Sequence, residues 1–183
     1  MAIARKNGIQ LRSLVLPRNQ VNPRYRDLIL EASIECYRGI QTSRIYTACP
    51  LGQATLHKRG AKFIDQFFAL SGSNVVQWDD VIEENGLCNV ALSRFLRPFK
   101  PALQHLDALR LERIVKGIEA AALSHGIYHL SWHPHNFGTN TAENITFLSG
   151  VLEAFARIRE RHGMRSLTMA DVAATALGAP PRG

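Results

Sequence analysis

Residues 127–138 hold the densest group of side chains that could do chemistry. The segment reads IYHLSWHPHNFG and contains three histidines and an asparagine: His129, His133, His135 and Asn136. Histidine exchanges protons near neutral pH and binds metals through a ring nitrogen. On a strand, His129 and His133 would lie about 13 Å apart, too far to share a metal without a bend. His133 and His135 can meet if Pro134 forms a turn. The group fits a functional pocket and hydrogen-bonded structural histidines equally well.

A second candidate group follows an apolar segment near the N-terminus. Residues 11–16 (LRSLVL) are typical of a buried strand that ends at Pro17, and Arg18 and Asn19 follow directly. Such an arginine either orients a carboxylate or another anion in a pocket, or is the solvated side chain of a turn. Functional groups in parallel sheets gather at the carboxyl ends of strands. Arg18, Asn19 and residues 133–136 all follow directly after such a strand.

Strand and helix patterns alternate along the chain. Strands are predicted over residues 11–16, 33–37, 127–132 and 166–169. Helices are predicted over residues 23–32, 60–70, 103–124, 140–162 and 170–177. This order predicts an α/β fold with mostly parallel strands, but four strands are too few to close a parallel barrel. If residues 127–132 form a strand, His129, Ser131 and His133 share one face.

Several residues mark the expected ends of these helices. Pro23 suits a first helical turn, and Gly126 and Gly163 are typical of helix stops. Asn140, followed three residues later by Glu143, has the spacing of a capping box. The acidic residues between 79 and 84 could be paired acid and base groups, but a solvated helix start explains them better.

Composition indicates a single domain over residues 1–183 that is soluble and without a membrane span. The chain has a net charge of +7, and ten basic against three acidic residues in positions 1–60 account for all of it. No nucleic-acid-binding motif accompanies these charges, so we expect no nucleic-acid partner. The N-terminus lacks the pattern of a signal peptide, and the three cysteines form no CxxC pair. We therefore expect a cytoplasmic protein with free thiols.

The common enzyme signatures are absent from the sequence. It contains no G-x-S-x-G, no G-x-x-x-x-G-K and no G-x-G-x-x-G motif. These absences exclude the usual signatures of α/β hydrolases, phosphate-binding loops and dinucleotide-binding domains.

Separate segments nevertheless resemble, in order, the motifs of polysaccharide deacetylases with a NodB-homology domain. Residues 9–22 (IQLRSLVLPRNQVN) and 34–39 (IECYRG) are similar to the third-motif region of one subgroup, and residues 127–138 are similar to its last motif. Residues 87–99 (LCNVALSRFLRPF) resemble its middle segment, and residues 163–169 (GMRSLTM) its final strand. The resemblance covers nearly the whole chain.

The resemblance implies a distorted (β/α) barrel and hydrolysis of the N-acetyl amide of amino sugars in a polysaccharide or oligosaccharide. In this family a divalent, zinc-like metal polarises the amide carbonyl and activates water, an aspartate is the base, and a histidine protonates the departing amine. By resemblance, His133 is the general acid and Arg18 orients the catalytic aspartate. Asn19, His129 and Asn136 match motif positions and are assigned to substrate binding.

The sequence also departs from the family pattern. The Thr-Phe-Asp-Asp-like and His-x-x-x-His-like segments, which supply the base and most metal ligands, do not occur, and Asp79-Asp80 follows the third motif rather than preceding it. The chain therefore resembles the C-terminal portion of a deacetylase, a partial barrel with exposed strand edges. We expect either a complementary N-terminal half or self-association. The alternative is a catalytically inactive carbohydrate-binding or assembly module.

Overall fold

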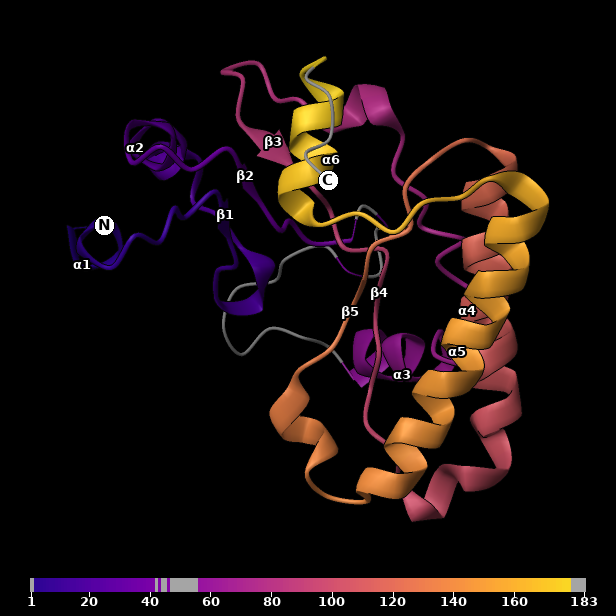
Figure 1. Ribbon diagram of the computed structural model, residues 1–183. Helices are drawn as coiled ribbons and strands as arrows, with labels where there is room; N and C mark the ends of the chain where they lie inside the picture. Colours follow the sequence, from indigo (N-terminus) through magenta and orange to yellow (C-terminus); the bar gives the residue numbers. More distant parts are fainter. Residues whose placement is uncertain (1, 42, 44–45, 47–55, 179–183) are drawn as a thin grey trace. The chain divides into compact units, whose positions relative to one another are not determined.

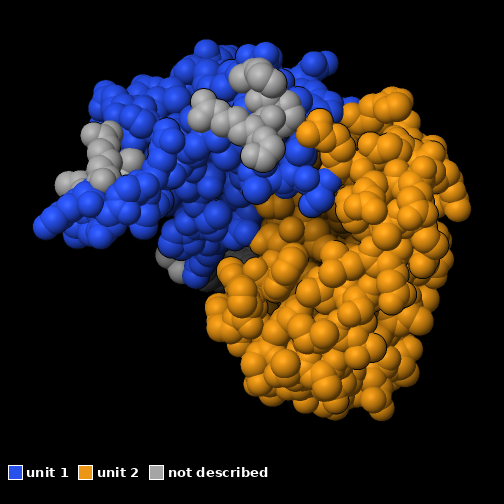
Figure 2. Space-filling view, in the orientation of Figure 1, with its two compact units in different colours: residues 1–40, 76–91, 166–183 blue, residues 41–75, 92–165 orange. Residues whose placement is uncertain are grey.

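The computed structural model describes residues 2–41, 43, 46 and 56–178, and its helices and strands are labelled in Figure 1. The chain divides into two compact units, coloured separately in Figure 2. Unit 1 comprises residues 1–40, 76–91 and 166–183, and unit 2 comprises residues 41–75 and 92–165. Both units combine helices with short parallel strands, which confirms the mixed α/β character. In the described part of the chain, no helix is long and apolar enough to cross a membrane.

Unit 1 is built on a three-stranded parallel sheet. Its strands are β1 (Ser13–Leu14), β2 (Cys36–Tyr37) and β3 (Cys88–Asn89), with β2 in the centre. Its helical elements are α1 (Ala2–Lys6), η1 (Pro17–Asn19), η2 (Pro23–Tyr25), α2 (Arg26–Glu31), η4 (Trp78–Asp80) and α6 (Met169–Ala176). The predicted strands at 11–16 and 33–37 are thus present, although only two residues of each form ladder pairs.

The core of unit 1 forms where α2 packs against the sheet. Ile29 of α2 is buried together with Ile34, Tyr37 and Leu87. Pro23 begins η2, as predicted, because its missing N–H and fixed φ suit a first helical turn. Helix α6 lies beside β2, so residues near both ends of the chain share this unit.

Unit 2 combines one strand pair with two long helices. Strands β4 (Arg94–Phe95) and β5 (Leu130–Ser131) are parallel, with Arg94 opposite Leu130. The helical elements are α3 (Leu56–Ile64), η5 (Pro101–Leu106), α4 (Asp107–Leu123), η6 (Pro134–Phe137) and α5 (Thr141–His162). Helices α4 and α5 pack along each other (Figure 1).

The apolar stripes of α4 and α5 form the core of unit 2. Ile114 and Ile118 of α4 are one turn apart and buried, and they meet Val151 and Ile158 of α5. A Cβ atom added to Gly150 would lie 3.3 Å from Leu111 Cδ2, so a small residue lets the helices approach closely. The helical periodicity predicted from the sequence is confirmed for both helices.

Two boundary predictions are wrong for local reasons. Residues 166–169 do not form a strand, because Thr168 caps α6 in a true capping box with Asp171. The predicted capping box at the start of α5 is absent: Asn140 has a left-handed backbone with φ 56° and makes no side-chain cap. Instead, the buried Asn144 side chain donates to the Asn140 carbonyl and accepts from the Phe99 N–H.

The other helix ends lie at or near the predicted positions, with shifts of a few residues. Gly163 ends α5 with φ 67°, as predicted. At the end of α4 the left-handed residue is His125, and the Gly126 N–H reaches back to the Ala121 carbonyl at 2.9 Å. Helix α3 overlaps the predicted helix over residues 60–70 only in part. It begins at Leu56 and ends at Ile64, so both ends lie several residues earlier in the chain than predicted. Strands β3 and β4 are not among the predicted strands. They have two paired residues each, as β1, β2 and β5 do, but they lie within residues 71–99, where turn-forming residues interrupt the apolar pattern.

Candidate functional site

The histidine segment, residues 127–138, contains β5, and hydrogen bonds to the neighbouring strand β4 and to Ser93 hold it in place. The His129 N–H donates to Ser93 Oγ at 2.9 Å, and the Leu96 N–H donates to the Ser131 carbonyl at 2.8 Å. His129 is half-buried, Ser131 is buried and His133 is exposed. The three residues therefore have different environments, although alternation along a strand would place them on one face.

The Pro134 turn brings His133 and His135 together. Their ring centroids are 5.2 Å apart with an interplanar angle of 17°, so the rings are stacked. Pro134 begins η6, and the Asn136 N–H donates to the His133 carbonyl at 3.0 Å, which closes the turn. The Phe95 ring of β4 lies 5.1 Å from the His133 ring. This places two exposed imidazoles, supported by an aromatic ring, at the carboxyl end of β5.

An aromatic pair lies within the same segment. The Trp132 and Phe137 rings are stacked, with centroids 6.4 Å apart and an interplanar angle of 19°. Phe137 is buried, whereas 37% of Trp132 remains exposed. A large ring that is held from one side and open on the other offers a flat apolar surface to a ligand. Asn136 is half-buried next to this pair.

Arg18 and Asn19 belong to unit 1, whereas the histidines belong to unit 2. Both residues have left-handed backbones, with φ of 58° and 56°, inside the single turn η1. This conformation is uncommon outside glycine and is a feature of strained or functional turns. Arg18 is exposed, and Asn19 Oδ1 accepts a hydrogen bond from Arg38 Nε at 2.8 Å. Burial lowers the pKa of Arg38. Arg38 thus belongs to this group, although no sequence motif predicted it.

The acidic residues between 79 and 84 do not form an acid–base pair. Asp79 and Asp80 are exposed in η4, as expected for a solvated segment. Glu83 accepts a hydrogen bond from the Tyr37 hydroxyl at 2.6 Å and pairs with Arg26 at 3.3 Å. Burial, together with the Glu83 carboxylate, raises the pKa of Tyr37.

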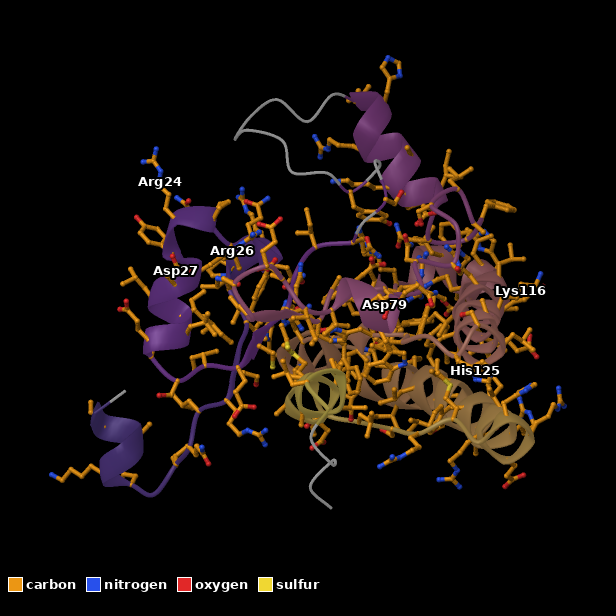
Figure 3. The ribbon with its side chains drawn as sticks, turned by 90° about the horizontal axis from the view of Figure 1, so that it is seen from above. Arg24, Arg26, Asp27, Asp79, Lys116 and His125 are labelled. Atoms are coloured by element: carbon orange, nitrogen blue, oxygen red, sulfur yellow. The ribbon has the colours of Figure 1, made fainter. Side chains whose placement is uncertain are left out.

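A second contact links the segment around Glu83 to the charged residues at the start of α2. Arg24, Arg26 and Asp27 are labelled there in Figure 3. Asp27 accepts a hydrogen bond from the Asn85 side chain at 3.1 Å. The acidic segment of unit 1 thus contacts its basic segment.

The excess positive charge is distributed differently from the sequence expectation. Unit 1 holds eight Lys or Arg and eight Asp or Glu residues, whereas unit 2 holds fourteen and seven. The acidic residues of 79–84 and Asp171 fold into the same unit as the basic N-terminal segment, and they balance it. The whole net charge of +7 therefore belongs to unit 2.

A buried polar cluster in unit 2 was missed. Asp65 is fully buried and accepts hydrogen bonds from the Ser71 N–H at 2.6 Å, the Ser71 hydroxyl at 2.8 Å and the Tyr46 hydroxyl at 2.9 Å. Arg94 and Arg113 flank the carboxylate. Burial and the Asp65 carboxylate raise the pKa of Tyr46 to about 12. One feature of the sequence could have predicted the cluster: Arg113 falls within the apolar stripe of α4, so its charge must be buried with the stripe.

The described residues do not fit a metal by themselves. Across residues 2–41 and 56–178, no group of three or more His, Cys, Asp or Glu side chains could hold a metal ion. His133 and His135 offer two imidazoles, whereas a catalytic zinc site normally uses three protein ligands.

Cys36 and Cys88 are buried free thiols opposite each other on β2 and β3, and burial raises the pKa of Cys36 to about 12. Such thiols are inert rather than reactive.

The site that the geometry offers is therefore the exposed histidine segment of unit 2. It contains a stacked imidazole pair, a half-exposed indole and an amide, all placed by β5 and the η6 turn. Its groups can donate and accept protons and can stack against a ligand. No protein-family model, no curated protein and no solved structure matches this chain in comparisons with known proteins.

Proposed function

We propose that this chain is a polysaccharide deacetylase-like protein that takes part in hydrolysis of the N-acetyl amide of amino-sugar chains. The observation that carries the proposal is the stacked His133–His135 pair at the carboxyl end of β5, where parallel α/β folds concentrate their functional groups. The ordered resemblance of several segments to deacetylase motifs supports it. The short parallel strands would be part of a distorted (β/α) barrel.

In this proposal His133 donates a proton to the departing amine. Amide hydrolysis needs such a donor, because an unprotonated amine is a poor leaving group. The His133 ring is exposed, so a substrate can reach it, and the contacts with Phe95 and His135 restrict its orientation. Asn136 and His129 would bind the sugar. Arg18, as the group that orients the catalytic aspartate, and Asn19, as a substrate-binding residue, belong to unit 1, and their roles rest on the resemblance alone.

The proposal places the base and most metal ligands outside this chain. No group of three or more His, Cys, Asp or Glu side chains among the described residues could hold a metal. A second polypeptide that resembles the missing N-terminal half would supply these groups. Its contribution would complete the site around His133.

The aromatic pair favours a second candidate function, a carbohydrate-binding or assembly module without catalysis. The indole of Trp132 is held by Phe137 and is half open to solvent. Sugar rings present apolar C–H faces that stack on such platforms, so binding requires neither a metal nor a base. This candidate uses the same segment but does not need His133 as a proton donor.

One experiment separates the two functions. The native protein is isolated from its source cells with any bound partner, and acetate release from N-acetylglucosamine oligomers is measured together with oligomer binding. A deacetylase releases acetate, and His133→Ala introduced into the native gene lowers turnover by about 10²-fold or more while binding is retained. Binding without acetate release, lost in Trp132→Ala, identifies a binding module. If the protein neither binds nor deacetylates the oligomers, both functions are wrong.

A further inference from the structure

The buried cluster around Asp65 contains more positive than negative charge. Arg94 and Arg113 are 5% and 4% exposed, and their Nη2 atoms lie 3.2 Å and 3.9 Å from the two Asp65 carboxylate oxygens. Arg94 also donates to the Asp65 carbonyl at 3.1 Å, and Arg113 donates to the Gly72 carbonyl. Arginine stays protonated in proteins. Two guanidiniums therefore share one carboxylate, and the cluster has a charge of +1.

No other carboxylate of unit 2 neutralises this excess. Asp107 pairs with Arg110, and Glu112 and Glu119 pair with Lys116 and Arg161. The three remaining acidic side chains, Glu143, Glu153 and Glu160, are exposed on α5. The residues outside the described ranges contain no Asp or Glu. The charge is therefore unbalanced within unit 2, in a place where burial makes an unbalanced charge unfavourable.

Three hydrogen-bond donors of this cluster are also unused. The Arg94 Nε–H, the Arg113 Nε–H and the Tyr128 O–H are shielded from solvent, and none of them donates a hydrogen bond among the described residues. The Tyr128 oxygen is within reach of the Arg94 guanidinium, from which it can only accept, so its own O–H stays unused. The two guanidiniums lie near the Tyr128 hydroxyl: burial raises its pKa, and the two positive charges oppose this. Buried polar groups in native proteins are nearly always satisfied. Three unused donors beside an excess positive charge point to an absent acceptor.

The approach of Tyr128 to the cluster is built into α4. A Cβ atom added at Gly117 would lie 2.8 Å from the Tyr128 hydroxyl oxygen, so only glycine leaves room for the ring. Gly117 is one turn beyond Arg113 on the same helix. Helix α4 thus carries the Arg113 guanidinium and, one turn later, the glycine against which the Tyr128 ring packs.

We propose that this cluster binds a small monovalent anion, of the size of chloride or formate. A single negative charge balances the excess of +1, whereas a dianion would overcompensate it. The ligand must be small, because the three donor atoms are shielded from solvent. An anion accepts charge-assisted hydrogen bonds from guanidinium N–H groups and from a hydroxyl. The site is separate from the histidine segment and does not depend on the proposed function.

Thermal unfolding of the full chain tests this site. The midpoint is measured in sodium chloride, sodium formate and sodium gluconate at one ionic strength, with gluconate as a monovalent anion too large to be enclosed. Above its Kd, the bound anion raises the midpoint by about 4 °C for each tenfold increase in concentration. A rise in chloride alone identifies a halide site, and a rise in formate alone identifies a carboxylate site. Equal midpoints in all three salts mean that the cluster holds only water, and they overturn the proposal.

Three variants locate the effect. Arg113→Met removes the excess charge and abolishes the anion dependence. Tyr128→Phe removes one donor at nearly constant volume and reduces the dependence, which keeps the test decisive if the methionine variant does not fold. Arg110→Met is the matched control: it also removes a buried guanidinium of α4, but one paired with Asp107 at 2.5 Å, so the anion dependence stays. Loss of the dependence in Arg110→Met, or its persistence in both other variants, contradicts the site.

Discussion

The ion pairs of the two units differ in how many carboxylates face their guanidiniums. In unit 1, Arg12 donates to both oxygens of Glu35, at 2.8 and 2.7 Å, and Arg26 pairs with Glu83. Each of these two guanidiniums has its own carboxylate. In unit 2, one carboxylate, Asp65, serves two guanidiniums and is far more deeply buried. A balanced pair leaves no net charge to compensate, whereas in our proposal the unbalanced buried cluster takes its counter-ion from outside the chain.

The chain offers a direct way to measure the two units separately. It has two tryptophans, Trp78 in unit 1 and Trp132 in unit 2. Trp78→Phe leaves a fluorescence signal from unit 2, and Trp132→Phe leaves one from unit 1. Urea unfolding in these two backgrounds reports the free energy of unfolding near each tryptophan.

The largest expected effect is that of Asp65→Ala. The substitution leaves two guanidiniums buried without a carboxylate and removes the acceptor of Tyr46 and Ser71. Breaking a buried ion pair in this way costs about 3–5 kcal/mol, observed with the Trp132 reporter. Asp107→Ala, which removes the partly exposed partner of Arg110, is the control and costs clearly less. Similar losses in the two variants would show that burial of the Asp65 cluster has no special weight.

Gly117→Ala tests the packing that holds Tyr128 in the cluster. The added methyl group collides with the Tyr128 ring, so we expect a loss of about 1–3 kcal/mol. Gly60→Ala in α3 is the matched change at a helical glycine with open space around it, and there we expect a gain of up to about 1 kcal/mol. If both variants change stability in the same direction, Tyr128 does not pack against α4 as described.

Alkaline pH provides a graded test of the same cluster. The pKa of Tyr46 is raised to about 12, so the folded state retains its phenolic proton while the unfolded state loses it near pH 10. The stabilisation is therefore complete below pH 10 and is lost as the pH rises towards 12.

Because the Tyr46 ring is partly exposed, we expect a loss of about 1 kcal/mol between pH 9 and 11. Tyr46→Phe removes this part of the pH dependence in urea titrations with the Trp132 reporter. Tyr25→Phe, at an exposed tyrosine of unit 1, leaves it unchanged. An identical pH profile for wild type and Tyr46→Phe would contradict the Tyr46–Asp65 contact.

The smallest expected effect is that of Glu35→Gln in unit 1. The Arg12 and Glu35 side chains are 21% and 34% exposed, so water replaces the lost partner. We expect a cost of about 0.5–1 kcal/mol with the Trp78 reporter, shrinking further at high salt. A loss as large as that of Asp65→Ala would remove the contrast between the two units.

Patterns that repeat along the chain were predictable from the sequence. The 3.6-residue spacing of apolar residues predicted α4 and α5, because each helix buries a continuous stripe. Pro17 and Pro134 marked the turns after β1 and β5, where the candidate residues lie. The approach of His133 and His135 followed from the turn between them. Strands β3 and β4 lie within residues 71–99, where turn-forming residues interrupt the apolar pattern, so the sequence did not predict them.

The tertiary structure alone decided which distant charges meet. Asp65, Arg94 and Arg113 come from three separate segments, and no local pattern connects them. Residues 76–91 and 166–178 join the basic N-terminal segment in unit 1, which moves the excess charge to unit 2. Local periodicity is determined by neighbours along the chain, and the sequence therefore defines helices and turns. Burial and charge pairing depend on segments tens of residues apart, so only the folded chain reveals the Asp65 cluster and its unused donors.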